Sequence, residues 1–158
     1  MVFRRLGRRD YDKLAAWLRS DSQKYFDKAV RVLGYVLPEA MYSRDKDTVD
    51  VLLSELVSAF WYWDSRVPRI PDWRTPEELD EKLVEREKMR DRRRELALLL
   101  ERVRAHASRL RSGHGGKKIA SKVTKVIDEL ERRWNLLAAK RTAEGVGEGP
   151  WKVLVLER

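Results

Sequence analysis

The fold of this chain is decided by one uninterrupted stretch, residues 75–111, which read TPEELDEKLVEREKMRDRRRELALLLERVRAHASRLR. Thr75 is a favourable N-cap, Pro76 suits the first helical turn, and two glutamates follow at the positive end of the helix dipole. The next strong helix breaker is the glycine-rich run at residues 113–116. The stretch therefore predicts a single helix from Pro76 to about Arg111, roughly 54 Å long at 1.5 Å per residue.

The middle of this predicted helix is its most highly charged part. Residues 86–95 read REKMRDRRRE, and Met89 is their single apolar side chain. The apolar stripe that a helix turns toward a core is clear at Leu79 and Leu83 and resumes at Leu96. Between these positions we expect the arginines to project into water or to meet an anion.

Apolar residues at helical spacing predict further helices on both sides of this stretch. The segments that show this spacing are residues 10–37, 48–63 and 117–142. We expect the first segment to break near residues 20–22, at a capping box of Ser20 and Gln23, and to end before Pro38. Asp47 or Thr48 is the expected cap of the second segment.

The end of the chain is predicted to differ from the rest. The glycine-rich residues 144–150 form a flexible joint, and residues 151–156 alternate weakly, with valines that favour a strand. The predicted fold class is all-α, with a basic N-terminal arm and helix–turn–helix at residues 1–38, a helical bundle containing the long Arg-rich helix at residues 39–143, and the joint and short C-terminal strand at residues 144–158. Because a lone strand is seldom stable, we expect it to pair with another subunit.

The composition narrows the classes of function. Among 158 residues there is no cysteine and there are two histidines, which excludes thiolate chemistry and leaves little for a His-rich metal site. No carboxylate pair, Ser/His/Asp set or metal cluster stands out, so we expect a non-enzymatic protein with no metal and no cofactor. No apolar run is long enough to span a membrane, and the N-terminus has no secretory signal. We therefore expect a cytoplasmic location.

The net charge of +9 is unevenly distributed. Residues 1–9 contain four arginines and no acid, and residues 88–125 contain 13 basic and three acidic side chains. Together these two blocks carry +14, and the remainder of the chain carries −5. Positive charge gathered in this way is typical of proteins that bind nucleic acid.

We therefore predict contacts between basic side chains and nucleic-acid phosphates. The candidates are Arg4, Arg5, Arg8, Arg9, Arg86, Arg90, Arg93, Arg94, Lys117 and Lys118. The two lysines open the last predicted helix, where backbone amides also attract anions. For the central arginines the alternative is a solvated helix face that is balanced by acids one turn away. For the arm the alternative is a frayed, solubilising terminus, and for the lysines it is a plain helix–helix turn.

Six tryptophans raise the question of base stacking. Trp17, Trp61 and Trp134 fall on or beside apolar stripes and are predicted to pack in the core. Trp73 and Trp151 lie at loop and tail positions, where we expect contacts between subunits.

The N-terminal third resembles the coat proteins of rod-shaped and filamentous viruses of hyperthermophilic archaea. The resemblance is carried by Arg4, Arg5, Arg8, Arg9, Tyr11 and Trp17, by the break at residues 20–22 and by the ending at Val36, Leu37 and Pro38. In that family a helix–turn–helix arm wraps linear double-stranded DNA, holds it in the A-form and packs on a helical bundle. The resemblance implies a structural protein that self-assembles with like subunits and coats double-stranded DNA in a virion assembled in the host cytoplasm.

Three alternative functions remain open, and one of them is a purely structural protein-interaction bundle that binds no nucleic acid. Arg109 and His114 form an Arg-x4-His pattern that resembles the catalytic motif of HEPN-type ribonucleases, which are also helical. The other alternative is a small helical subunit of a CRISPR ribonucleoprotein, because composition does not separate such a subunit from a coat protein.

His106 shares a helix face with Leu99 and Val103, which favours a place at the edge of the core.

Overall fold

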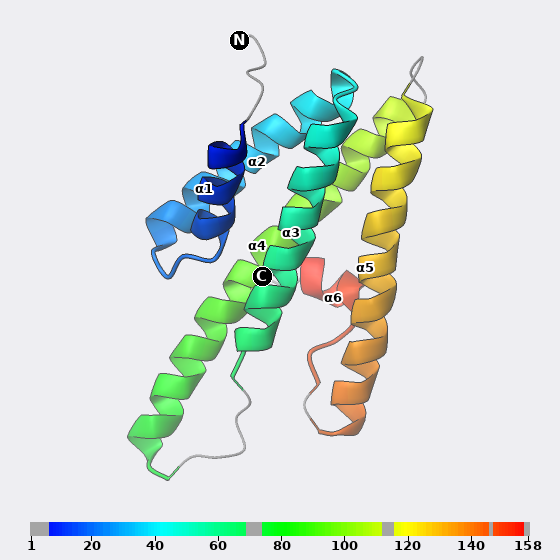
Figure 1. The fold of residues 1–158 in the computed structure, drawn as a ribbon. Coiled ribbons are helices and arrows are strands. Elements are labelled where there is room, and N and C mark those ends of the chain that lie inside the picture. Colours follow the sequence, from blue (N-terminus) through cyan, green and yellow to red (C-terminus); the bar gives the residue numbers. More distant parts are fainter. Residues whose placement is uncertain (1–6, 69–73, 112–115, 146, 157–158) are drawn as a thin grey trace.

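A computed structural model describes residues 7–68, 74–111, 116–145 and 147–156 of the chain. These residues form six helices and no strand, so the chain is all-α. The helices are α1 (Arg8–Leu18), α2 (Gln23–Tyr42), α3 (Lys46–Arg66), α4 (Pro76–Arg111), α5 (Lys117–Ala143) and α6 (Trp151–Leu156) (Figure 1). None of the described helices is both long and apolar enough to cross a bilayer.

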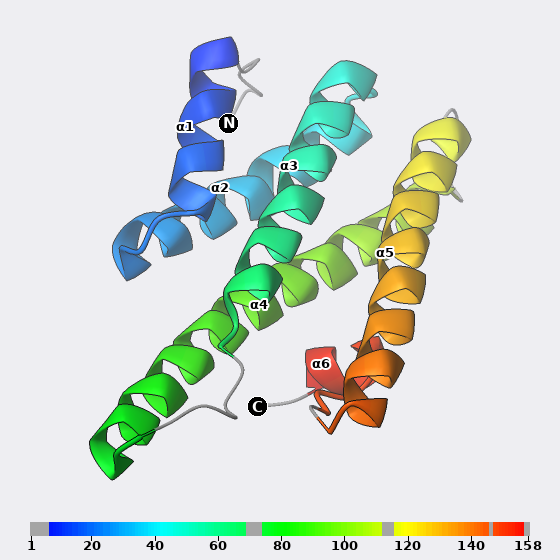
Figure 2. The same ribbon diagram turned by 60° about the horizontal axis from the view of Figure 1, so that its bottom comes forward.

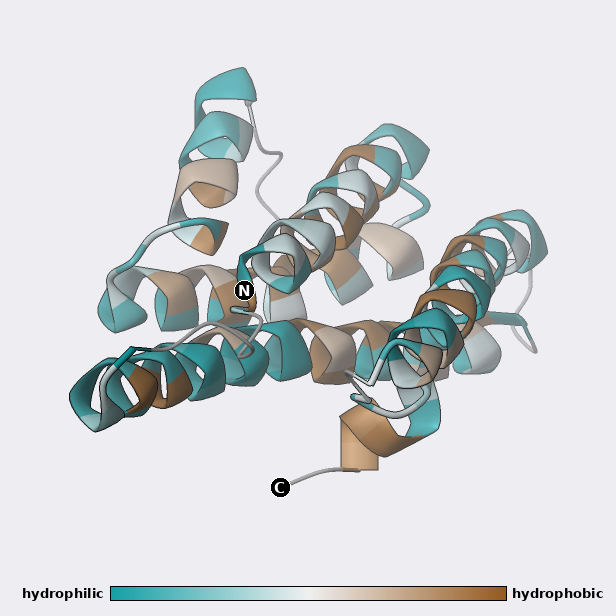
Figure 3. Ribbon diagram, turned by 90° about the horizontal axis from the view of Figure 1, so that it is seen from below, coloured by the Kyte–Doolittle hydropathy of each residue, from teal (hydrophilic) through white to brown (hydrophobic). Residues whose placement is uncertain are grey.

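The 36-residue helix α4 is the base on which the other helices pack. Helices α2, α3, α5 and α6 all contact it, and α1 packs on α2 and α3 at the edge of the molecule. After a turn of 60°, α4 still runs diagonally beneath α3 and α5 (Figure 2). Hydrophobic and hydrophilic residues alternate along these helices, as expected when one face of each helix is buried (Figure 3).

The core is one continuous cluster that extends from α1 to α6. Its largest side chains are aromatic, and Phe60 on α3 lies at their centre. The ring centroid of Phe60 is 5.8 Å from that of Trp134 and 5.4 Å from that of Trp151. Trp63 is fully buried, and its indole N–H donates to the Leu18 carbonyl over 2.6 Å, which ties the end of α1 to α3.

Several predicted boundaries are confirmed, but two predicted caps are wrong. The long helix begins after Thr75, whose Oγ1 accepts from the Glu78 amide, and it ends at Arg111. Helix α2 starts after Ser22 rather than at a Ser20 capping box. The cap of α3 is Asp45, whose carboxylate accepts from the Thr48 amide.

The prediction that the second helix ends before Pro38 is wrong, because α2 continues to Tyr42. A proline in a helix removes one hydrogen bond and its ring crowds the carbonyl four residues earlier. That residue is Gly34, and Pro38 itself is buried between Leu37 and Met41 in the core. The apolar burial of this turn offsets the lost hydrogen bond, and the predicted boundary at residue 38 falls inside a helix.

The predicted C-terminal strand is also wrong, because residues 151–156 form α6. Trp151 and Leu154 are buried three residues apart, which is a helical spacing. The backbone amide of Trp151 donates to Asn135 on α5, and its indole N–H donates to Glu101 on α4, each over 2.7 Å. These contacts place Trp151 in the core of its own chain rather than at a subunit contact.

This placement of the tail predicts a large effect of removing the Trp151 side chain. Trp151→Ala is expected to lower the free energy of unfolding by about 3–5 kcal/mol, because it empties a fully enclosed site. Urea unfolding followed by circular dichroism measures the change. Val153→Ala on the exposed face of α6 is the control, and equal small effects of both substitutions would contradict the observed packing.

Candidate nucleic-acid interface

Two arginines from the middle of α4 point into the protein interior. Arg92 is 1% exposed and Arg93 is fully buried. The guanidinium of Arg92 donates to the carbonyls of Ser20 and Asp21, and its carbon lies 4.5 Å from the ring centroid of Trp63. Arg92 therefore holds the α1–α2 turn against α4, and burial lowers its pKa from the ordinary value.

Arg93 belongs to a buried four-residue ion network, formed with Asp64, Arg141 and Glu148. Its Nη1 lies 2.8 Å from Asp64 on α3 and 2.9 Å from Glu148 in the segment before α6. Arg141 on α5 contacts the same two carboxylates at 2.9 and 3.1 Å. The network therefore links three helices and the tail.

The physical chemistry of this network explains why the charges are tolerated inside. Two arginines and two carboxylates give no net charge, and the hydrogen bonds of Arg93 Nη1 and of Arg141 replace part of the lost water. Nε and Nη2 of Arg93 are buried without a hydrogen-bond partner. The guanidinium carbon of Arg93 also lies 4.7 Å from the ring centroid of Trp134, whose π face attracts a cation. The hydrogen bond with Asp64 raises the pKa of Arg141 above the ordinary value.

The predicted phosphate ligands on α4 therefore lie in different surroundings, some in the interior and some near the surface. Arg93 lies in the interior, with its nearest acids supplied by its own chain. Arg90 and Arg94 are half-buried and pair with Glu87 at 3.2 Å and Asp91 at 2.6 Å, each three residues earlier on the same helix. Arg86 is also half-buried. These arginines do not form a single exposed cationic block.

A different group of basic residues lies at one end of the fold, the upper end in Figure 1, where α1, α3 and α5 start and α2 and α4 end. Tyr11 near the start of α1 is 3.3 Å from Thr48 at the start of α3. Tyr42 at the end of α2 is 3.0 Å from His106 near the end of α4. The second turn of α5 is joined to α3 by an ion pair of Lys122 with Asp50.

We call this region the basic end and define it by eight exposed basic side chains. They are Arg8, Arg9, Arg44, Lys46, Arg109, Arg111, Lys117 and Lys118. Four of the predicted residues, from the starts of α1 and α5, are among them, whereas Arg4 and Arg5 lie outside the described residues. Acids are also present at this end. Asp10 accepts from the Gly7 amide at the start of α1, Asp45 caps α3, and Asp47 in the first turn of α3 is exposed.

The start of α5 is held close to the end of α4. A side chain at Gly116 would place its Cβ 2.5 Å from the carbonyl oxygen of Leu110, so only glycine fits this approach. The contact brings Arg109 and Arg111 of α4 to the same end of the bundle as Lys117 and Lys118. The backbone amides at the start of α5 and its dipole favour an anion beside these lysines.

A second surface feature combines cations with aromatic rings, and sequence reasoning missed it. Trp17 on α1 stacks on Tyr25 on α2 with ring centroids 5.7 Å apart. Lys13 and Lys28 lie over the Trp17 ring, with Nζ to centroid distances of 4.8 and 5.1 Å. Tyr25 is 45% exposed, whereas Trp17 is partly buried and packs against the core.

The other sequence predictions have mixed outcomes. Trp134 is fully buried as predicted, and Trp61 is partly buried against the core. His106 is half-buried and touches Tyr42, which confirms its place at the edge of the core. His114 and Trp73 lie outside the described residues.

Neither metal ligands among the described residues nor similarity to known proteins points to a functional site. Among the described residues, no group of three or more histidine, aspartate or glutamate side chains is arranged to hold a metal ion. No protein-family model matches the chain, and neither a curated protein nor a solved structure shows significant similarity to it. The candidate interface therefore rests on the chemistry and position of its own residues.

The buried network predicts opposite outcomes for two neighbouring arginines. Arg93→Ala is expected to lower the free energy of unfolding by about 3–5 kcal/mol, because it leaves two buried carboxylates with one cation between them. Arg94→Ala is expected to change stability by about 0.5 kcal/mol or less, because its ion pair is near the surface. Urea unfolding of both variants measures the difference, and similar costs would show that Arg93 is not buried in an ion network.

The pKa of His106 gives a further test. Burial, followed by the charge of Arg109, lowers this pKa below the ordinary value of 6.5. The unfolded chain then binds the proton at a higher pH than the folded one, so stability falls as pH drops from 6.5 through the folded pKa. NMR titration of a His114→Gln background gives a single histidine pKa.

Arg109→Gln in that background tests the two causes separately. The pKa of His106 is expected to rise only in part, because burial is the larger cause. A pKa at or above 6.5 before this substitution would contradict the half-buried position of the ring.

Proposed function

We propose that this protein binds nucleic acid through phosphate contacts of the basic end. The observation that supports the proposal is the convergence of eight exposed basic side chains from four helices and one turn. Arginine and lysine neutralise phosphates, and the start of α5 adds backbone amides and a favourable dipole. Such contacts are largely independent of sequence.

The cation–aromatic cluster of Lys13, Trp17, Tyr25 and Lys28 supports the same proposal. It lies on the helix hairpin that begins with Arg8 and Arg9, so a bound strand has both phosphate ligands and an aromatic surface within one hairpin. In a duplex the bases are paired with each other, so Lys13 and Lys28 rather than the rings supply the contacts to its phosphates. Helical hairpins with basic starts are also what the resemblance to archaeal viral coat proteins rests on.

In its most specific form, the proposal is that many copies of the chain coat linear double-stranded DNA as a viral coat protein. The resemblance of the N-terminal third supplies this form, and the basic end supplies the chemistry. Electron microscopy of the purified protein with and without linear DNA tests it directly. Regular particles that protect DNA from nuclease are expected, and free DNA beside unassembled protein would contradict the coat function.

The salt dependence of binding tests the phosphate contacts themselves. Each double-stranded phosphate contact contributes about −0.9 to the slope of log affinity against log salt concentration. The double variants Arg8→Gln/Arg9→Gln and Lys117→Gln/Lys118→Gln are each expected to flatten the slope by roughly one to two and to weaken binding at low salt. Fluorescence anisotropy of a labelled duplex measures both quantities.

The matched control removes the same charge away from the basic end. Lys140→Gln/Lys152→Gln alters two exposed lysines, one near the far end of α5 and one on α6. This pair is expected to leave the slope nearly unchanged. A flat salt response of the wild type, or equal effects of all three double variants, would remove the basic end as the binding surface.

A further inference from the structure

The first part of α4 projects beyond the helical bundle. We call residues 76–88 the projecting segment, and none of them is buried, because the first buried residue of α4 is Met89. In Figures 1 and 2 this segment extends past the end of α3. It is about 20 Å long at 1.5 Å per residue.

The projecting segment combines exposed apolar side chains with negative charge. Val84 is 73% exposed and Leu83 is 41% exposed, and they are adjacent on the helix. Six acidic and three basic side chains give the segment a net charge of −3 in a chain whose total is +9. An amphipathic helix of this kind is suited to a groove with an apolar floor and basic surroundings.

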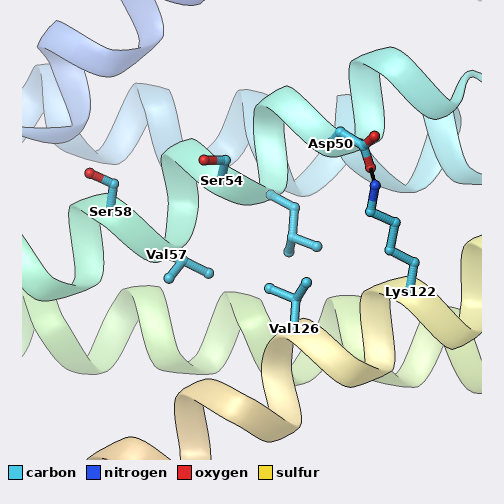
Figure 4. Close-up of a pocket in the computed structure, with 7 residues that line it drawn as sticks. Asp50, Ser54, Val57, Ser58, Lys122 and Val126 are labelled. Carbon is cyan, nitrogen blue, oxygen red and sulfur yellow. Dashed lines mark ion pairs between the residues drawn. The ribbon is translucent and has the colours of Figure 1, made fainter.

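A groove with these properties lies between α3 and α5 (Figure 4). Both helices rest on α4 and leave a hollow of about 440 Å³ between them. Its floor is formed by Leu53 and Val57 of α3 and Val126 of α5, and Lys122 and Asp50 meet at one end, 2.7 Å apart. Ser54 and Ser58 line the α3 side.

Charge complementarity identifies what fits this groove. Of the residues that line the groove, Lys122 is basic and Asp50 is acidic, and the two are paired. Lys118 and Lys125 are exposed and lie one turn before and one turn after Lys122, so the three lysines share a face of α5. This edge of the groove is therefore positive where the projecting segment is negative. The segment is a continuous part of α4 and extends away from the groove of its own chain (Figures 1 and 2). A second copy of the chain therefore supplies the matching helix.

We propose that the projecting segment of one copy docks in the α3–α5 groove of a second copy. Leu83 and Val84 then cover the apolar floor, and the acids of the segment lie beside the lysines of α5. The contact joins two different surfaces, so each bound pair retains one unused segment and one unused groove. Such head-to-tail contacts propagate into open chains unless the geometry closes a ring.

The test uses two variants that disable opposite sides of the contact, in the absence of nucleic acid. Leu83→Gln/Val84→Gln removes the apolar face of the segment while keeping good helix formers. Ser54→Glu/Lys122→Gln makes the groove more negative at exposed positions. Circular dichroism checks that both variants keep the wild-type helicity and thermal unfolding.

Sedimentation velocity then measures association between roughly 10 µM and 1 mM, a range that covers weak and moderate affinities. The wild type is expected to form species larger than a dimer, and each variant alone is expected to remain monomeric. An equimolar mixture of the two variants is expected to form a one-to-one dimer that grows no further, because it has one intact segment and one intact groove.

Matched controls separate this contact from general effects of polarity and charge. Leu136→Gln/Val153→Gln removes exposed apolar side chains elsewhere, and Ser108→Glu/Lys140→Gln makes the same charge change away from the groove. Both controls are expected to associate like the wild type. A monomeric wild type, a monomeric mixture, or equal losses in the controls would each overturn the proposal, whatever the outcome of the nucleic-acid experiments.

Discussion

The fold depends on placing the Arg92 and Arg93 side chains inside the protein. Arg93 shares Asp64 and Glu148 with Arg141, and this network holds α3, α5 and the tail against the middle of α4. Arg92 does the same for the α1–α2 turn by donating to its carbonyls. Removing one partner of a buried charge is strongly destabilising, so these contacts fix how the helices are arranged as well as holding them together.

Because Arg92 and Arg93 point inward, positive charge is distributed differently on the surface than along the sequence. In the sequence, the central basic block is a continuous stretch, but its most arginine-rich part serves the interior or pairs with acids on the same helix. Eight exposed basic side chains lie at the basic end, and the other exposed lysines and arginines are spread over the rest of the described surface. Residues far apart in the sequence, such as Arg8 at the start of α1 and Lys118 at the start of α5, are brought to one end of the molecule.

The two ends of the long helix α4 carry surfaces of opposite charge. The basic end lies at its C-terminal end, and the acidic projecting segment forms its N-terminal end (Figure 1). If copies associate through the projecting segment and the α3–α5 groove, the basic ends repeat at regular intervals along the assembly. A repeated basic surface is what a protein needs to follow a nucleic-acid backbone without reading its sequence.

The helices themselves were largely predictable from the sequence, because caps, prolines and apolar periodicity act locally. Pro76 and the following acids mark the start of α4, and the periodicity of residues 117–142 indicates α5. The side chains of Arg93 and Arg94 look alike in sequence, yet one step of about 100° around the helix separates the interior from the surface. Trp134 and Asp64, which receive Arg93, come from distant segments, so only the tertiary structure decided which arginine is buried. The same reason explains the tail, where local β-propensity was overridden by contacts of Trp151 with α4 and α5.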